Sequence, residues 1–341
     1  MGNDASPRIA VAGAGSVGCY VGTCLSLAGR DVTLLMRDRL ARPARKHGLE
    51  VCDLGGWARS AMPGSLAIET DAAKALKGAD IVLVTVKSSN TDEIAGLVKR
   101  HAPAATVVSL QNGIGNVQLL KRKLGKAAVV AAAMVPFNVV QTISDGAAPR
   151  FLRATSGTLL VDGNAPGLQA LLDVPGLEVR EHADMTGVLW SKLVLNMNNA
   201  LNALSGLPLV QELADPQWRQ LLAGQMDEAL GAIGAAGISL ARIEGVHPKL
   251  IPHALRLPTP LFRLVARKML AIDPDARSSM WEDFQQGRKT EIDFLQGAVI
   301  DLAHKHDRSA PLCERVVALV KEREKTKSGK PLTPKDILAK A

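Results

Sequence analysis

Short apolar runs recur through the first half of the chain and alternate with stretches of helical character. The runs are rich in Val, Ile and Leu and lack a clean polar alternation, as expected for strands of a parallel sheet whose two faces are both covered. They fall at residues 8–13, 31–37, 80–87, 105–113, 128–134 and 157–163. This pattern predicts an α/β domain of the Rossmann type, with a doubly wound sheet.

The strand rhythm stops near residue 185, and helical segments bounded by Pro and Gly follow. We expect helices at residues 190–204, 216–237, 258–270, 291–306 and 312–325. A length of 341 residues is also more than one ordinary domain requires. With the boundary between residues 180 and 186, the sequence predicts a Rossmann-type domain over residues 1–184 and an all-α C-terminal domain over residues 185–341.

The composition narrows the classes of partner. Aromatic residues make up only 3% of the chain, which argues against stacking on nucleobases. The net charge of +8 is spread along the sequence without a concentrated basic helix, so we expect no nucleic-acid partner. A mild positive charge suits an anionic cofactor and an anionic substrate.

The four cysteines indicate a reducing compartment, because they show neither CxxC nor disulfide-like spacing. We therefore expect a cytoplasmic protein with no metal site. The uncharged run over residues 9–29 is long enough for a membrane span, but glycines and hydroxyl residues interrupt it, and it lacks a signal-peptide pattern. A strand, a turn and a buried helix explain it better, and no membrane partner is expected.

A GxGxxG pattern directly follows the first strand and opens a helix, which is the context that dinucleotide binding requires. It consists of Gly13, Ala14, Gly15, Ser16, Val17 and Gly18. In such a motif the first glycine permits a tight turn, the second lets the backbone approach a pyrophosphate, and the third lets helix and strand pack closely. The phosphates would then meet amides at the helix N-terminus.

Arg37 ends the second strand, where an NAD enzyme usually presents an acid to the ribose 2′-hydroxyl. An arginine there favours the 2′-phosphate of NADP through a charge-assisted contact. Asp38 comes one residue too late for the usual acid. The sequence thus predicts NADP as the cofactor, used as NADPH.

Two more candidate residues end later strands, at the sheet edge where open α/β folds bind ligands. Lys87 follows the strand at 80–86 and could neutralise a phosphate or carboxylate, or it could be an ordinary surface lysine. Asn112 lies in the QNGIG segment and could have a functional role at this edge, or it could be only a turn residue.

Lys192, Asn196 and Asn199 stand at i, i+4 and i+7 of an otherwise apolar helix and so share one stripe. Reduction of a ketone places negative charge on the carbonyl oxygen, which must be held and protonated. A lysine ammonium can supply that proton, and amides can hold the substrate's oxygens. The alternative is a network of amides that only packs helices together.

Two further polar segments follow, RSSM at residues 277–280 and GRKTEID at residues 287–293. Thr290 is a plausible helix N-cap, and Asp293 would complete an acidic capping box. Glu291 would then lie in the first turn, from which it could point to an active-site lysine.

The ordered set of GAGSVG, Arg37, Lys87, QNGIG, the lysine helix, RSSM and GRKTEID resembles the ketopantoate reductase family, from about residue 8 to residue 300. The resemblance implies a Rossmann domain and a helical domain, with NADPH and a 2-oxo acid bound between them. It makes Lys192 the general acid, and Glu291 an assisting residue that also touches the cofactor. It places Asn112, Asn196 and Ser279 on the substrate, and the glycines, Arg37, Lys87 and Asn112 on the cofactor.

The chain departs from the family pattern at two places. Family members often carry an asparagine eight residues after the lysine, where this chain has Ala200, so Asn199 or Asn202 would replace it. The stretch from 245 to 276 also looks longer than in the family. Both changes concern substrate choice, so the 2-oxo acid is ketopantoate or a close relative.

Two other functions compete with this interpretation. A β-hydroxyacid dehydrogenase would pair similar domains and oxidise a 3-hydroxy acid, but RSSM and GRKTEID favour the first reading. A non-catalytic NADP-binding sensor would bind the cofactor without turnover. A homodimer is possible on either reading, since the long helices could pack between chains.

Overall fold

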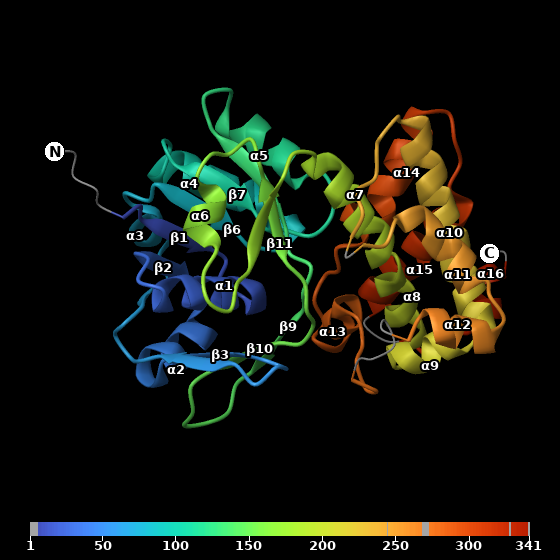
Figure 1. The fold of residues 1–341 in the computed structure, drawn as a ribbon, viewed down its shortest axis with the longest axis horizontal. Coiled ribbons are helices and arrows are strands. Elements are labelled where there is room, and N and C mark those ends of the chain that lie inside the picture. The colour runs from blue at the N-terminus through green and yellow to red at the C-terminus, as the bar shows by residue number, and fades with distance from the viewer. Residues whose placement is uncertain (1–5, 244, 268–272, 327–328, 340–341) are drawn as a thin grey trace. The chain divides into compact units, whose positions relative to one another are not determined.

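The computed structural model describes residues 6–243, 245–267, 273–326 and 329–339. The chain forms two compact units, Met1–Met185 and Thr186–Ala341. Figure 1 shows that the strands belong to the first unit and that the second is built from helices. The predicted fold class, a Rossmann-type α/β domain followed by an all-α domain, is confirmed. Within the described ranges no helix is both long and apolar enough to cross a membrane.

The first unit is organised around an eight-stranded sheet in the order β12-β11-β8-β7-β6-β1-β2-β5. Its strands are β1 (Ile9–Ala12), β2 (Val32–Leu35), β5 (Ala67–Glu69), β6 (Ile81–Val84), β7 (Thr106–Ser109), β8 (Val130–Met134), β11 (Leu159–Asp162) and β12 (Val179–His182). All six predicted strands are among them. Pairing is parallel except between β8 and β11. The chain reverses its direction of winding at β1, which lies between β2 and β6.

Both faces of this sheet are buried, which explains the missing polar alternation. On β1, Ile9 and Val11 enter one apolar cluster, and Ala10 and Ala12 enter another. The first cluster includes α1 (Ser16–Leu27), and the second includes α3 (Ala72–Leu76), α4 (Thr91–His101) and part of α5 (Asn116–Leu124). Helices therefore cover the two faces from opposite sides (Figure 1).

A second sheet, which the sequence analysis did not predict, packs against α1. It has the order β4-β3-β10-β9, with bounds Ala58–Ala61, Leu49–Asp53, Arg150–Arg153 and Val139–Thr142. Helix α2 (Asp38–His47) leads directly into β3. β3 and β10 pair in parallel although about a hundred residues separate them. Short strands paired at such separation leave little local signal in a sequence.

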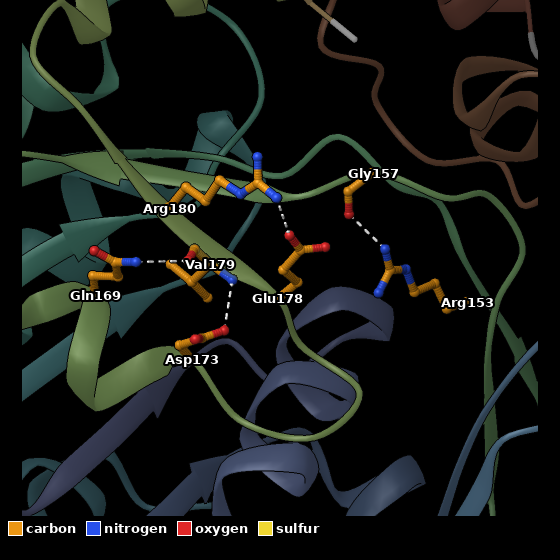
Figure 2. Close-up of polar contacts among 7 residues, drawn as sticks. All are labelled: Arg153, Gly157, Gln169, Asp173, Glu178, Val179 and Arg180. Carbon is orange, nitrogen blue, oxygen red and sulfur yellow. Dashed lines mark hydrogen bonds and ion pairs between the residues drawn. The ribbon is translucent and has the colours of Figure 1, made fainter.

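The last strand of the first unit is tied down by short-range polar contacts (Figure 2). Helix α6 (Leu168–Leu172) precedes it. Asp173 accepts from the amide of Val179 at 3.0 Å, and Gln169 donates to the Val179 carbonyl at 3.2 Å. Arg180 pairs with Glu178 at 2.7 Å on the exposed side. Figure 2 also shows Arg153 reaching the carbonyl of Gly157 before β11.

The second unit consists of helices. They are α7 (Met185–Asn196), α8 (Asn198–Ser205), α9 (Leu209–Ala214), α10 (Pro216–Ala235), η2 (Pro248–Leu250), α11 (Ile251–Leu255), α12 (Thr259–Val265), α13 (Ser279–Gln285), η3 (Ile292–Phe294), α14 (Gln296–Lys305), α15 (Pro311–Thr326) and α16 (Pro334–Leu338). The buried face of α10 packs against α14 and α15. The helix predicted at 258–270 is present as α12, and residues 268–270 lie outside the described residues.

The single helix predicted over 190–204 is wrong, because the chain breaks it at Met197 into α7 and α8. The side chain of Gln296 donates to the Met197 carbonyl at 2.9 Å. A side chain that takes a carbonyl from the i to i−4 ladder is a recognised cause of helix kinks. The spacing of i+7 between Lys192 and Asn199 therefore does not place them on one regular helix.

The capping box expected at Thr290 and Asp293 is also wrong. A 3-10 turn occupies residues 292–294, and α14 begins only at Gln296. The Thr290 hydroxyl accepts from the amide of Ile292 instead. Asp293 forms an ion pair with Lys321 on α15 at 2.6 Å. A tertiary partner thus replaces the local one.

Candidate functional site

The carboxyl ends of four neighbouring strands lie at one edge of the large sheet. Ala12 is in register with Leu35 of β2 and Val84 of β6, and Val84 is in register with Ser109 of β7. The segments at 13–18, 36–38, 85–88 and 110–113 therefore leave the sheet side by side. This edge is where an open α/β sheet binds its ligand.

Two glycines of the GxGxxG segment are required by close packing against the loop after β6. Gly13 has a left-handed φ of +93°, and a Cβ there would lie 2.2 Å from the Val86 side chain. A Cβ on Gly18 would lie 2.5 Å from Oγ1 of Thr85. That hydroxyl donates to the Gly13 carbonyl at 2.9 Å. The glycines thus bring α1, β1 and β6 close together.

Gly15 differs, because its neighbourhood is open. A Cβ there would come no closer than 3.9 Å to another heavy atom, the carbonyl oxygen of Gly13. Gly15 is exposed and is the N-cap of α1, with no side-chain hydrogen bond to the cap. The helix therefore begins without a side-chain acceptor for its first amides, which suits an anion such as a pyrophosphate. The buried Ala14 and the half-buried Ser16 and Val17 complete the turn.

Arg37 is exposed two residues after β2 ends and is the N-cap of α2. Its place just beyond β2, the strand next to β1, suits contact with the ribose end of a dinucleotide whose phosphates lie at the glycine turn. Asp38 occupies the first turn of α2, where a negative charge stabilises a helix. That local role accounts for an acid at the position after the arginine.

The loops after β6 and β7 are braced by buried polar side chains that the sequence analysis did not single out. Gln111 donates to the Val86 carbonyl at 3.0 Å and to Oγ1 of Thr91 at 2.7 Å. Asn116 donates to the hydroxyl of Ser88 at 3.0 Å and to the carbonyl of Asn112 at 2.8 Å. Because all of these partners except Asn112 and Asn116 are 20 to 28 residues apart, most of the bracing has no local signature.

This bracing uses the backbone of Asn112 and leaves its side chain exposed at the sheet edge. Lys87 is half-buried at the start of the 3-10 turn η1 (Ser88–Asn90). Both residues therefore lie on loops fixed by hydrogen bonds, at the edge that carries Gly15 and Arg37. Their roles stay a prediction.

In the second unit, Lys192 and Asn196 lie one turn apart on α7, and both are half-buried. Asn199 lies in the first turn of α8, beyond the break at Met197. The Gln296 side chain that reaches Met197 also donates to Gln225 of α10 at 3.1 Å. The start of α14 is thereby held against the end of the lysine helix.

Glu291 lies five residues before that Gln296 tether and is half-buried ahead of η3. The segment around it is anchored on both sides. Arg288 pairs with the buried Asp283 at 2.9 Å, and the amide of Thr290 donates to Glu324 of α15 at 2.7 Å. Glu291 is thus carried by a fixed segment whose end contacts the α7–α8 break.

The RSSM segment is attached to α8. The Ser278 hydroxyl donates to the Asn199 carbonyl at 3.0 Å and accepts from the amide of Trp281, which makes Ser278 the N-cap of α13. Ser279 is the first residue of α13 and is exposed. Of the two serines, Ser278 caps the helix and Ser279 is exposed.

Asn199 and Asn202 are distinguished by burial. Asn202 is 0% exposed, and its amide oxygen accepts from the Ser278 backbone amide at 2.8 Å. Its nitrogen donates to the Leu207 carbonyl at 2.9 Å. Asn199 is half-buried and gives only its backbone carbonyl to these contacts. Asn199 is therefore the better candidate for a substrate-facing amide in place of the residue missing at Ala200.

Each unit has one chemical capacity. The first presents a turn with open amides, an arginine and a lysine, which together suit a dinucleotide phosphate. The second gathers an ammonium, a carboxyl group, amides and a hydroxyl on segments hydrogen-bonded to each other near the α7–α8 break. Such a set can bind an anionic carbonyl compound and supply it with a proton.

Comparisons with known proteins match both units. Residues 9–146 match the family model described as ketopantoate reductase PanE/ApbA, and residues 184–324 match the model of its C-terminal part. A 2-dehydropantoate 2-reductase of Halobacterium salinarum is 29% identical, with 92% of this chain and 98% of the relative covered. One of Pyrococcus horikoshii is 28% identical, with 94% and 99% covered.

The same likeness holds among solved structures. A PanE/ApbA family ketopantoate reductase from Ralstonia eutropha JMP134 superposes with a TM-score of 0.77 at 27% identity. The match covers 94% of this chain and 99% of that chain. Similarity therefore extends over both units.

Proposed function

The chain belongs to the ketopantoate reductase family of oxidoreductases, and from this premise we propose that it uses NADPH to reduce 2-dehydropantoate, or a closely related 2-oxo acid, to the 2-hydroxy acid. The reaction would supply the 2-hydroxy acid needed for pantothenate. The curated relatives support the substrate class, because the two compared above are both 2-dehydropantoate 2-reductases matched over nearly their whole length.

One observation carries the proposal for the second unit. Three segments far apart in sequence are hydrogen-bonded around the α7–α8 break, through Gln296 to Met197 and through Ser278 to Asn199. They are the segments that bear Lys192, Glu291 and Ser279. A general acid, a carboxyl group and a hydroxyl donor thus share one region of the unit, as protonation of a bound oxo acid requires.

The first unit fits the cofactor. Gly15 has open space where a side chain would stand, and α1 begins without a side-chain cap. When bound, NADPH supplies the hydride. Gly13, Gly15 and Gly18, with the residues between them, would hold the pyrophosphate, and Arg37 would hold the 2′-phosphate. Lys87 and Asn112 would contact the cofactor from the neighbouring loops.

The residues of the second unit would complete the chemistry. As the substrate's carbonyl oxygen gains negative charge, the Lys192 ammonium donates a hydrogen bond and then its proton. Asn196 and Asn199, together with Asn112 of the first unit, would bind the substrate's oxygens, and Ser279 would bind its carboxylate. Glu291 would orient the ammonium and contact the cofactor, because a carboxylate beside a lysine favours the charged form.

The decisive experiment is steady-state oxidation of NADPH and of NADH against a panel of 2-oxo acids, with oxidation of 3-hydroxyisobutyrate in a parallel arm. We expect the highest kcat/KM for ketopantoate or another branched 2-oxo acid with NADPH. Turnover of the 3-hydroxy acid alone would instead identify a β-hydroxyacid dehydrogenase. Tight NADPH binding without turnover of any compound would indicate a sensor.

A further inference from the structure

Two buried polar side chains of the second unit take no part in the chemistry proposed above. Asn202 lies in α8 and Glu212 in α9, and both are 0% exposed. Burying a carboxyl group and an amide is costly unless they are hydrogen-bonded. The hydrogen-bond partners of Asn202 and Glu212 therefore indicate the structural role of these two residues.

Asn202 connects the RSSM segment to the corner between α8 and α9. Its oxygen accepts from the Ser278 amide at 2.8 Å, across 76 residues of sequence. Its nitrogen donates both to the Leu207 carbonyl and to Oε2 of Glu212, the latter at 2.5 Å. The oxygen and the nitrogen of this amide group are thus both engaged, with the loop before α13, the turn before α9 and α9 itself.

Glu212 holds the side chain of Asn202 in place by accepting a hydrogen bond from it. Burial raises the pKa of its carboxyl group to about 8, although the hydrogen bond from Asn202 opposes the shift. Oε1 has no geometrically acceptable hydrogen-bond partner in the part of the chain that the structure describes. A neutral carboxyl group tolerates such surroundings better than an anion. Near neutral pH the carboxyl group is therefore protonated, while Oε2 still accepts from Asn202.

Further contacts fasten the same loop to the same corner. The Leu209 amide donates to the Ala276 carbonyl at 2.9 Å, at the start of α9. Nε of Arg277 donates to the Gly206 carbonyl at 3.3 Å. The Arg277 guanidinium also lies 4.7 Å from the ring centroid of Trp281. The loop over residues 276–278 is held at its backbone as well as its side chains, and Ser279 follows at once.

We propose that Asn202 and Glu212 are positioning residues for substrate binding, which hold the segment at 277–279 against α8 so that the Ser279 hydroxyl and the Asn199 amide face the same ligand. The role of Ser279 and Asn199 as ligand-facing groups rests on the proposed function. The bracing of the segment rests on the contacts alone.

The physical reason is that Asn202 holds the backbone only one residue away from the Ser279 hydroxyl group. Asn202 binds the backbone of Ser278, and the next residue carries the hydroxyl group. A binding group displaced by about an ångström loses most of its effect, so backbone support one residue away is efficient. Because a Ser278 contact to Asn199 joins the same two elements, loss of Asn202 should loosen the segment without detaching it.

The test compares Asn202→Ala, Glu212→Ala and Glu212→Gln with the wild type. Gln has the shape of the neutral acid and an oxygen that accepts from Asn202, so it should preserve the brace. Glu228→Gln is the matched control, because Glu228 accepts from the amides of Leu312 and Cys313 on α15 in the same unit. Asn202→Ser is a milder second variant in case Asn202→Ala does not fold.

The first readout is hydrogen exchange in the full-length protein, which needs no turnover. We expect amides in a peptide over 277–287 to exchange at least tenfold faster in Asn202→Ala and Glu212→Ala. Glu212→Gln and Glu228→Gln should leave that peptide unchanged. Unchanged exchange in both alanine variants would overturn the brace, whatever the enzyme's substrate proves to be.

The second readout is the kinetic split with NADPH and the best 2-oxo acid of the wild type. We expect KM for the oxo acid to rise about tenfold in the alanine variants, with KM for NADPH unchanged and kcat lowered less than threefold. An equal effect in Glu228→Gln would mean general destabilisation and would refute positioning. If the wild type reduces no oxo acid, the proposed function fails, and hydrogen exchange still decides the brace.

Discussion

At the scale of single residues, the structure separates exposed polar side chains from buried ones that hold neighbouring segments in place. Asn112 and Ser279 are exposed, whereas their sequence neighbours Gln111 and Ser278 are buried in hydrogen bonds. Adjacent polar residues of the same motif thus differ in burial and in hydrogen bonding. The sequence shows the motif, but only the structure shows which member is buried.

Arg37 is predicted to select the 2′-phosphate. Arg37→Ala should weaken NADPH binding by about 10- to 100-fold, as loss of a charge-assisted hydrogen bond of about 1.5–3 kcal/mol implies. NADH binding should change little, since NADH lacks that phosphate. Fluorescence titration with both cofactors measures the difference. Lys46→Ala is the control, because it removes one positive charge from the exposed last turn of the same helix; equal losses for NADPH and NADH in Arg37→Ala would refute the assignment.

Lys192 is predicted to be the proton donor. Lys192→Ala should lower kcat by a factor of about 100 or more, the usual contribution of general acid catalysis. Lys192→Arg should stay slow, because a guanidinium keeps its charge but does not release a proton near neutral pH. The dissociation constant for NADPH should hardly change in either variant. Normal turnover in Lys192→Ala would rule out this mechanism.

At the scale of elements, tertiary contacts decided where helices begin and break. The glycine turn followed its motif, since strand, turn and helix are local in sequence. The α7–α8 break and the late start of α14 did not follow the local sequence pattern. They depend on tertiary contacts, because Gln296 binds Met197 and Asp293 binds Lys321. The sheet of β3, β4, β9 and β10 was also missed. Its central pairing, β3 with β10, crosses about a hundred residues, although β3–β4 and β9–β10 pair locally.

The two glycines of the α1 turn should respond differently to a methyl group. Gly18→Ala should lower the free energy of unfolding by about 1–3 kcal/mol, because its Cβ would lie 2.5 Å from Oγ1 of Thr85. Gly15→Ala should leave stability nearly unchanged, since the heavy atom nearest to its Cβ would be the Gly13 carbonyl oxygen at 3.9 Å. It should nevertheless weaken NADPH binding by displacing the pyrophosphate. Thermal unfolding and cofactor titration of both variants provide the check; a stable Gly18→Ala would contradict the packing argument.

At the scale of the whole molecule, the proposed function assigns separate parts of the reaction to the two units. The first would bind the dinucleotide at its glycine turn, and the second would supply the groups for an oxo acid. Unfolding of the second unit can be followed separately, because it contains three of the four tryptophans, Trp190, Trp218 and Trp281. Their fluorescence therefore reports mainly on unfolding of the helical unit.

Glu212 should make the second unit less stable as pH rises. Its pKa is raised from 4.5 to about 8 in the folded state, so the folded chain holds a proton that the unfolded chain has lost. Stability is therefore lost between about pH 4.5 and 8, by up to about 4–5 kcal/mol at 1.36 kcal/mol for each pH unit. Glu212→Gln removes this dependence. The free energy of unfolding can be measured by urea titration with tryptophan fluorescence at pH 5 and pH 8. Relative to the wild type, Glu212→Gln should be more stable at pH 8 than at pH 5. The same difference in free energy at both pH values would contradict the raised pKa.

The sequence by itself determined the class of fold, the place of the nucleotide turn and the family, because each depends on periodicity or on motifs whose residues are close together. The sequence was also sufficient to identify the candidate site residues, among them Arg37 and Glu291. The tertiary structure alone decided which of these side chains is exposed and which is committed to a brace. Asn202 and Glu212 show why: contacts that join residues 10 and 76 positions apart are set by how helices pack, and no local pattern records that.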